Sequence, residues 1–132
     1  MPDTFTHHQS YKATIKETSR ELSPRERVRY KNTSGAIKLD EIIKDDEKFT
    51  IKPIGYVILD IHNDNADPED YENYVIVDAD NNTYITGSAS FWKQFKGIWD
   101  EMAGIEEDWE LEIFKLDSKN YKGKKFITCN IV

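Results

Sequence analysis

The chain has 132 residues, enough for one domain to bury a core without metal ions or disulfide bridges. Its net charge of −7 is unevenly distributed, because residues 10–39 carry eight Lys or Arg against three Glu. The single cysteine, Cys129, excludes an intramolecular disulfide, and no segment has the apolar length of a signal peptide or a membrane span. These features predict a soluble, cytoplasmic protein.

Residues 1–33 differ from the rest of the chain because they are polar, basic and weakly periodic. A Ser-Pro pair at 23–24 is typical of a helix start, and Arg25, Arg27 and Arg29 follow it. We interpret the segment as a basic N-terminal extension, in its simplest form a mobile arm that becomes ordered on contact with a partner. The alternative is an arm that packs on the following domain or is exchanged between subunits.

The most regular pattern in the chain is helical and spans residues 88–104. Apolar side chains recur there at the spacing of one helix face, on Phe91, Phe95, Ile98, Trp99 and Met102. A serine, Ser88 or Ser90, precedes this face as a cap, and Gly104 follows it, where a left-handed residue is favoured. We therefore predict one main helix.

Strand patterns lie on both sides of this helix. Alternating apolar residues predict five strands, at residues 49–63, 71–78, 83–86, 109–116 and 124–132. In the first of these strands, Pro53 and Gly55 indicate a bulge or an edge. Three strands, one helix and two strands is the order of an OB-fold. We therefore predict a mostly β domain over residues 34–132, a five-stranded antiparallel Greek-key barrel with the helix between strands three and four.

Signatures of catalysis and of metal binding are weak in this chain. The sequence has no phosphate-binding glycine loop and no nucleophile or zinc-protease motif. The acidic loop at residues 62–70 lacks the glycine and the final glutamate of a calcium-binding EF-hand loop. We expect no catalytic residue, no metal and no cofactor.

Aromatic side chains interleaved with lysines point to another chemistry, because single-stranded nucleic acid is bound by base stacking and by cations along the phosphates. Tyr56, Tyr74 and Tyr84 fall on strand faces opposite the predicted core, so we expect them on the outer surface of the first three strands. The last hairpin adds a second group, which consists of Tyr121, Phe126, Lys119, Lys122, Lys124 and Lys125. The alternative is that the tyrosines only cover the barrel and the lysines keep a turn soluble.

The segment from residue 51 to residue 132 resembles the OB-fold single-stranded DNA-binding proteins of bacteriophages and conjugative elements. The stretches that carry the resemblance are YITGSASFWKQF and KLDSKNYKGKKFITCNIV, together with the strand order. The resemblance implies sequence-tolerant binding of single strands during replication, recombination or transfer. The acidic loop after the first strand departs from this pattern, because its charge would repel the nucleic acid.

We therefore expect a non-catalytic protein that binds single-stranded DNA, with RNA as an open alternative and no membrane partner. The tyrosines would stack bases and the lysines would contact phosphates. Arg25, Arg27 and Arg29 would add charge or join subunits in a homo-oligomer. A second hypothesis is an acidic protein-binding module, or an inhibitor that imitates nucleic acid, because residues 60–80 and 100–112 hold fifteen acids and no Lys or Arg. A small hydrolase is a third.

Overall fold

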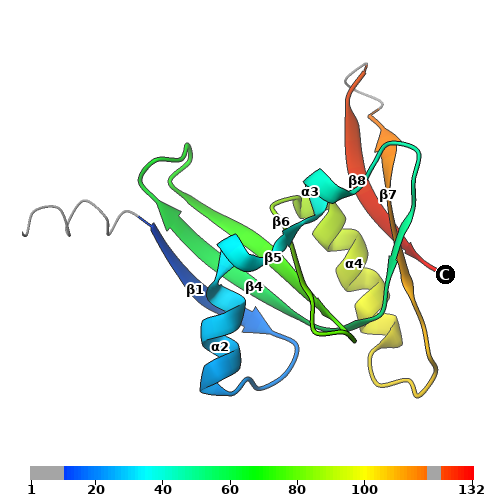
Figure 1. The fold of residues 1–132 in the computed structure, drawn as a ribbon, viewed down its shortest axis with the longest axis horizontal. Coiled ribbons are helices and arrows are strands. Elements are labelled where there is room, and N and C mark those ends of the chain that lie inside the picture. Colours follow the sequence, from blue (N-terminus) through cyan, green and yellow to red (C-terminus); the bar gives the residue numbers. More distant parts are fainter. Residues whose placement is uncertain (1–10, 119–122) are drawn as a thin grey trace, which may run out of the picture.

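The computed structural model describes residues 11–118 and 123–132 and shows a mostly β architecture with two sheets (Figure 1). The five-stranded sheet has the order β1-β4-β5-β6-β2 and the three-stranded sheet has the order β3-β7-β8. The strands are β1 (Tyr11–Thr18), β2 (Ile37–Lys38), β3 (Phe49–Ile51), β4 (Pro53–Asn63), β5 (Asp70–Asp78), β6 (Thr83–Thr86), β7 (Leu111–Asp117) and β8 (Lys125–Ile131). The helices are α2 (Pro24–Lys31), the 3₁₀ turn η2 (Thr33–Gly35), α3 (Leu39–Ile42) and α4 (Ala89–Met102). No helix in the described ranges is long and apolar enough to cross a membrane.

The expected order of three strands, one helix and two strands is confirmed, and the first expected strand is divided between the two sheets. Its first part, β3, pairs with β7, and its second part, β4, pairs with β5. The register shifts between Pro53 and Gly55, as a bulge at these residues predicts. A Cβ on Gly55 would lie 3.0 Å from the Ser19 hydroxyl, which accepts a hydrogen bond from the Tyr56 N–H, so a larger residue would disturb this contact between β4 and the segment after β1.

In the described residues, β6 and β8 lie in different sheets and do not pair with each other, so the strands form two sheets without the pairing that would close a barrel. The outer edge of β6 is instead taken by β2, which runs parallel to it with Ile37 opposite Tyr84. The two sheets are therefore joined through the β3–β4 segment.

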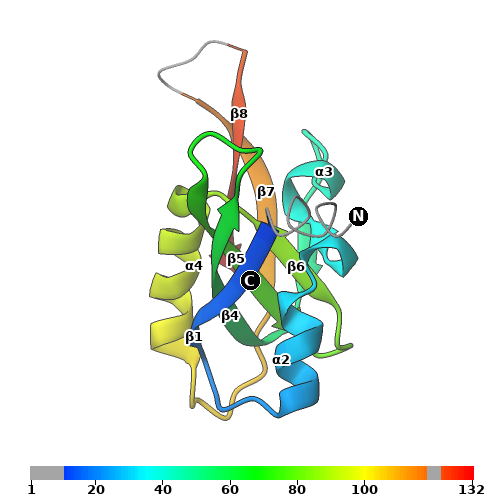
Figure 2. The ribbon, with the colours of Figure 1, turned by 90° about the vertical axis from the view of Figure 1, so that its left-hand side faces the viewer.

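Helix α4 packs against the inner sides of both sheets (Figures 1 and 2). Ser88 caps it by accepting a hydrogen bond from the Phe91 N–H, and Gly104 follows it with φ +87°, as the sequence predicts. Phe91 and Phe95 are fully buried among strand residues of both sheets. Burial of two such rings on one helix fixes the position of α4.

The expectation that Tyr56, Tyr74 and Tyr84 lie on an outer surface is wrong. All three are buried in the core between the sheets and α4. The strand alternation was read correctly, but both faces of this sheet are covered. The face assigned to the core, which includes Val57 and Leu59, is also buried, beneath the N-terminal segment.

Residues 11–33 form part of the five-stranded sheet and its cover, which corrects the interpretation of a separate mobile arm. Strand β1 pairs antiparallel with β4, from Tyr11 opposite Asn63 to Thr18 opposite Val57. Helix α2 crosses the outer face of the sheet and buries Tyr30 there (Figure 2). The packed alternative therefore describes this segment.

Candidate nucleic-acid interface

The three buried tyrosines have hydrogen-bond partners inside the protein. Tyr84 donates to Asp78 across 2.8 Å, and Tyr56 donates to Glu17 across 2.8 Å. Burial, followed by the Asp78 carboxylate, raises the pKa of Tyr84 to about 12. Burial also raises the pKa of Tyr56 and of Tyr74. These rings are neutral core residues and cannot stack on a base without leaving the core.

The hairpin of β7 and β8 carries the described part of the second predicted group. Phe126 is 40% exposed and lies opposite Leu116, which is 46% exposed, so the two form an open apolar pair. Lys125 is held by Asp117 at 3.0 Å, and Lys124 is exposed. An exposed ion pair of this kind is weak, so Lys125 can exchange Asp117 for a phosphate. The predicted contacts Lys119, Tyr121 and Lys122 lie outside the described residues.

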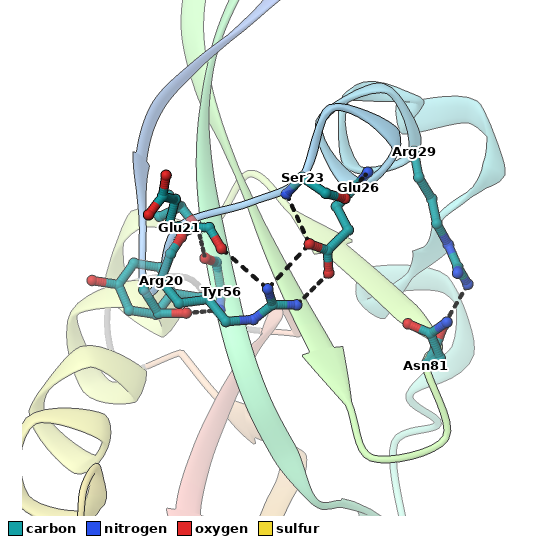
Figure 3. A network of polar contacts seen from close by, with 9 residues as sticks. Arg20, Glu21, Ser23, Glu26, Arg29, Tyr56 and Asn81 are labelled. Atoms are coloured by element: carbon teal, nitrogen blue, oxygen red, sulfur yellow. Dashed lines mark hydrogen bonds and ion pairs between the residues drawn. The ribbon is translucent and has the colours of Figure 1, made fainter.

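The arginines of α2 and of the segment before it have different environments (Figure 3). Arg20 binds both carboxylate oxygens of Glu26, whose pKa falls to about 2 because of this arginine and the Ser23 N–H. Arg29 donates to the carbonyl oxygen of Asn81 across 2.7 Å. Within the described ranges, Arg25 and Arg27 have no acidic partner and are exposed.

A groove of about 710 Å³ opens on the outer face of the five-stranded sheet, where α2 does not cover it. Its floor includes Asn73 of β5 and Ile85 and Thr86 of β6. One wall is the start of β1 and the other is the segment from the end of α2 to α3. This volume falls in the range of sites that hold small ligands.

The groove combines an aromatic ring with two cations. Tyr11 is 43% exposed, and its hydroxyl hydrogen-bonds Thr33 at 2.6 Å, which fixes the ring at the rim. Lys31 and Lys38 lie along the opposite wall. Lys38 pairs weakly with Glu41 at 3.7 Å, whereas Lys31 has no acidic partner in the described part of the chain.

Polar groups that can bind base edges are also present. Asn32 and Asn73 line the groove, and an amide has both donors and an acceptor. The Asn32 oxygen already accepts a hydrogen bond from the Ser34 hydroxyl across 2.8 Å, which leaves its amide N–H groups for a ligand. Asp40 also lines it, but its carboxylate accepts a hydrogen bond from Thr86 across 3.0 Å. The lining thus offers ring stacking, cationic contacts and amide hydrogen bonds in one place.

Sequence reasoning missed Tyr11, Lys31, Lys38 and the two asparagines. The signal for Tyr11 was its place in the alternating stretch YKATIKET, in a segment interpreted as an arm. The groove exists only because β1 and α2 fold back onto β4, β5 and β6, and a local pattern cannot show which distant strand β1 pairs with.

The end of β4 and the loop after it hold the one group of side chains in the described ranges that could bind a metal ion, His62, Asp64 and Glu69. Both imidazole nitrogens are already engaged, Nδ1 by Asp70 at 2.8 Å and Nε2 by Asp64 at 2.6 Å. Asp70, followed by Asp64, raises the pKa of His62. A stabilised imidazolium competes with metal binding, so this cluster is first of all an ion-pair network.

Comparisons with protein-family models, with curated proteins and with solved structures found no match.

Proposed function

We propose that this protein binds single-stranded DNA without catalysis, in the groove between β1 and α2. The observation that carries the proposal is the position of the groove over β5 and β6. In the order of strands along the chain, these correspond to strands two and three of an OB-fold, whose outer face binds oligonucleotides.

The same correspondence supports an OB-fold derivative as the architecture. The ladders β3–β7, β4–β5, β5–β6 and β7–β8 link the strands in the sequence expected for such a barrel, and α4 lies between strands three and four. Strand β2 occupies the edge of β6. We propose that the N-terminal segment is an addition that shapes the binding face.

In this mechanism, one base stacks on the ring of Tyr11, and Lys31 and Lys38 contact the neighbouring phosphates. Base–aromatic stacking is sequence-tolerant because every base has a π-face. The Thr33 hydrogen bond holds the ring before binding, which reduces the entropy lost on association. The exposed Phe126 and Lys125 of the β7–β8 hairpin provide a second contact.

Duplex DNA should bind less well, because its bases are paired and stacked and cannot reach Tyr11. The test is a fluorescence-anisotropy titration with labelled single-stranded and duplex oligonucleotides, with wild-type protein and with Tyr11→Ala. We expect single strands to bind more tightly and Tyr11→Ala to reduce this preference. Equal affinity for both forms, or no effect of Tyr11→Ala, would contradict the proposal.

The acidic surface supports a second candidate, a module that binds a basic protein. Glu101, Glu106, Glu107 and Asp108 are exposed and have no ion pair within the described ranges. If neither form of DNA binds at low salt, this candidate replaces the first.

A further inference from the structure

Two exposed patches of this protein have opposite charge and a similar layout. The first is the outward face of α2, where Val28 is 71% exposed. Arg25 and Lys31 lie one helical turn before and after Val28, and Arg27 and Arg29 flank it. We call this face the α2 patch.

The second patch is the last two residues of α4 and the loop that follows it, residues 101–108. Ile105 is 50% exposed at its centre, after the left-handed Gly104. Four exposed acids surround it in sequence, Glu101, Glu106, Glu107 and Asp108. We call this segment the acidic loop.

Most charged side chains of the two patches form no ion pair within the described part of the chain. In the described part of the molecule, the four acids of the acidic loop form no ion pair, and neither do Arg25, Arg27 and Lys31. Arg29 donates only to a neutral carbonyl group. Both patches therefore present an exposed aliphatic side chain among uncompensated charges of one sign, the layout of an apolar centre with a polar rim.

The two patches lie at the same end of the molecule. Both views place α2 and the loop after α4 at the lower end, on different sides of it (Figures 1 and 2). One copy carries both a basic and an acidic patch, so two copies can bind each other about a two-fold axis. The α2 patch of each copy then meets the acidic loop of the other copy. Such a contact occurs twice in one dimer and closes the assembly at two copies.

We propose that the chain forms a closed two-fold dimer in which the α2 patch of one copy binds the acidic loop of the other. Val28 and Ile105 form the apolar centre of each contact, and the charges fix the partner and its orientation. Lys31 belongs both to the α2 patch and to the groove, whereas Arg25 and Arg27 do not line the groove. Changes at these two arginines therefore test the dimer separately from nucleic-acid binding.

The test is sedimentation equilibrium at about 0.05 M and about 0.5 M salt, because exposed charge contacts weaken as the Debye length shortens. Wild-type protein should be a dimer at low salt and should dissociate at high salt. Arg25→Glu/Arg27→Glu should raise the dimer dissociation constant by about tenfold or more, because each reversed charge acts twice across the two-fold axis. Glu106→Lys/Glu107→Lys should do the same, and the protein with all four changes should recover the dimer.

Lys52→Glu/Lys93→Glu is the matched control, since it makes the same change of net charge at exposed sites away from both patches. It should leave the dimer intact. The proposal is overturned if the wild-type protein is a monomer at low salt or forms species larger than a dimer. It is also overturned if the variant that combines all four substitutions stays monomeric. A loss of oligonucleotide affinity in Arg25→Glu/Arg27→Glu without a change in mass would assign the α2 patch to nucleic acid and would also overturn it.

Discussion

The ring of Tyr74 stacks on the indole of Trp92, with the centroids 4.9 Å apart and an interplanar angle of 10°. This pair joins the central strand of the larger sheet to α4. Trp92 also stacks on Phe95 at 4.9 Å and meets Tyr56 edge-on at 5.2 Å. Two of the tyrosines that resembled a stacking surface in the sequence, Tyr56 and Tyr74, therefore form one aromatic cluster with the helix, whereas the Tyr84 ring meets Phe49 of β3.

The first prediction concerns this cluster. Tyr74→Ala should lower the free energy of unfolding by about 3–5 kcal/mol, the range for loss of a buried aromatic side chain. Tyr74→Phe should cost much less, because the ring is kept and only the hydrogen bond to Glu72 is lost. Urea titration of both variants gives the comparison. A loss below about 1 kcal/mol in Tyr74→Ala would show that the ring is not part of the core.

The register of these strands shows how far the sequence could predict the fold. Alternation correctly separated Val57 and Leu59 from Tyr56 and Ile58, because successive side chains of a strand point to opposite faces. It could not show which face was covered by α4, since both faces are apolar and both are buried. The choice between the two faces depends on which of them packs against Trp92 of α4. Tertiary packing decides this, and the local sequence does not show it.

The N-terminal strand was missed for a related reason. In β1 the partly buried residues are Ala13, Ile15 and Thr18, and the only other aromatic or apolar residue, Tyr11, is exposed. A strand at the edge of a sheet with one exposed face shows little hydrophobic pattern. Its stability comes from the ladder with β4, whose partner residues lie far away in the sequence.

The second prediction follows from this pairing. Deletion of residues 1–33 should abolish the cooperative thermal transition, because it removes β1 from β4 and uncovers Val57, Leu59 and Val75. Tyr30→Ala is a milder test and should lower the free energy of unfolding by about 3–5 kcal/mol. Val28→Ala on the exposed side of the same helix is the control, measured at about 0.5 M salt, where the proposed dimer is dissociated. It should change the free energy of unfolding by about 0.5 kcal/mol at most. An unchanged calorimetric transition in the truncated chain would show that this segment is an independent arm.

The third prediction concerns His62. Its pKa lies above the ordinary value of 6.5 because of hydrogen bonds to Asp70 and Asp64. The folded state therefore holds the proton more tightly than the unfolded state. The stabilisation is complete below pH 6.5 and is lost as the pH rises through the folded pKa.

A pH titration of the His62 ring resonances by NMR measures this pKa directly. Asp70→Asn should lower it toward the ordinary value, because the largest stabilising contact is lost. Asp67→Asn, in the same loop, is the control and should have a smaller effect. A wild-type pKa at or below 6.5 would contradict the ion-pair network.

The last prediction separates charge from stacking in the groove. Each phosphate contact releases condensed counterions, so the logarithm of affinity for single strands falls with the logarithm of salt by about 0.7 per contact. Lys31→Ala/Lys38→Ala should therefore weaken binding and make this slope shallower by about 1.4. Tyr11→Ala should cost about 1–3 kcal/mol of binding free energy with the slope nearly unchanged, because a neutral ring releases no ion.

Two variants complete this experiment. Tyr11→Phe keeps the ring and loses only the hydrogen bond to Thr33, so it should bind nearly as well as the wild type. Lys52→Ala/Lys93→Ala removes the same charge outside the groove and should leave the slope close to the wild-type value. If both lysine pairs change the slope equally, the attraction is a property of the whole surface and the groove has no special role. If Tyr11→Phe binds as poorly as Tyr11→Ala, the hydroxyl rather than the ring makes the contact, and base stacking at this residue is refuted.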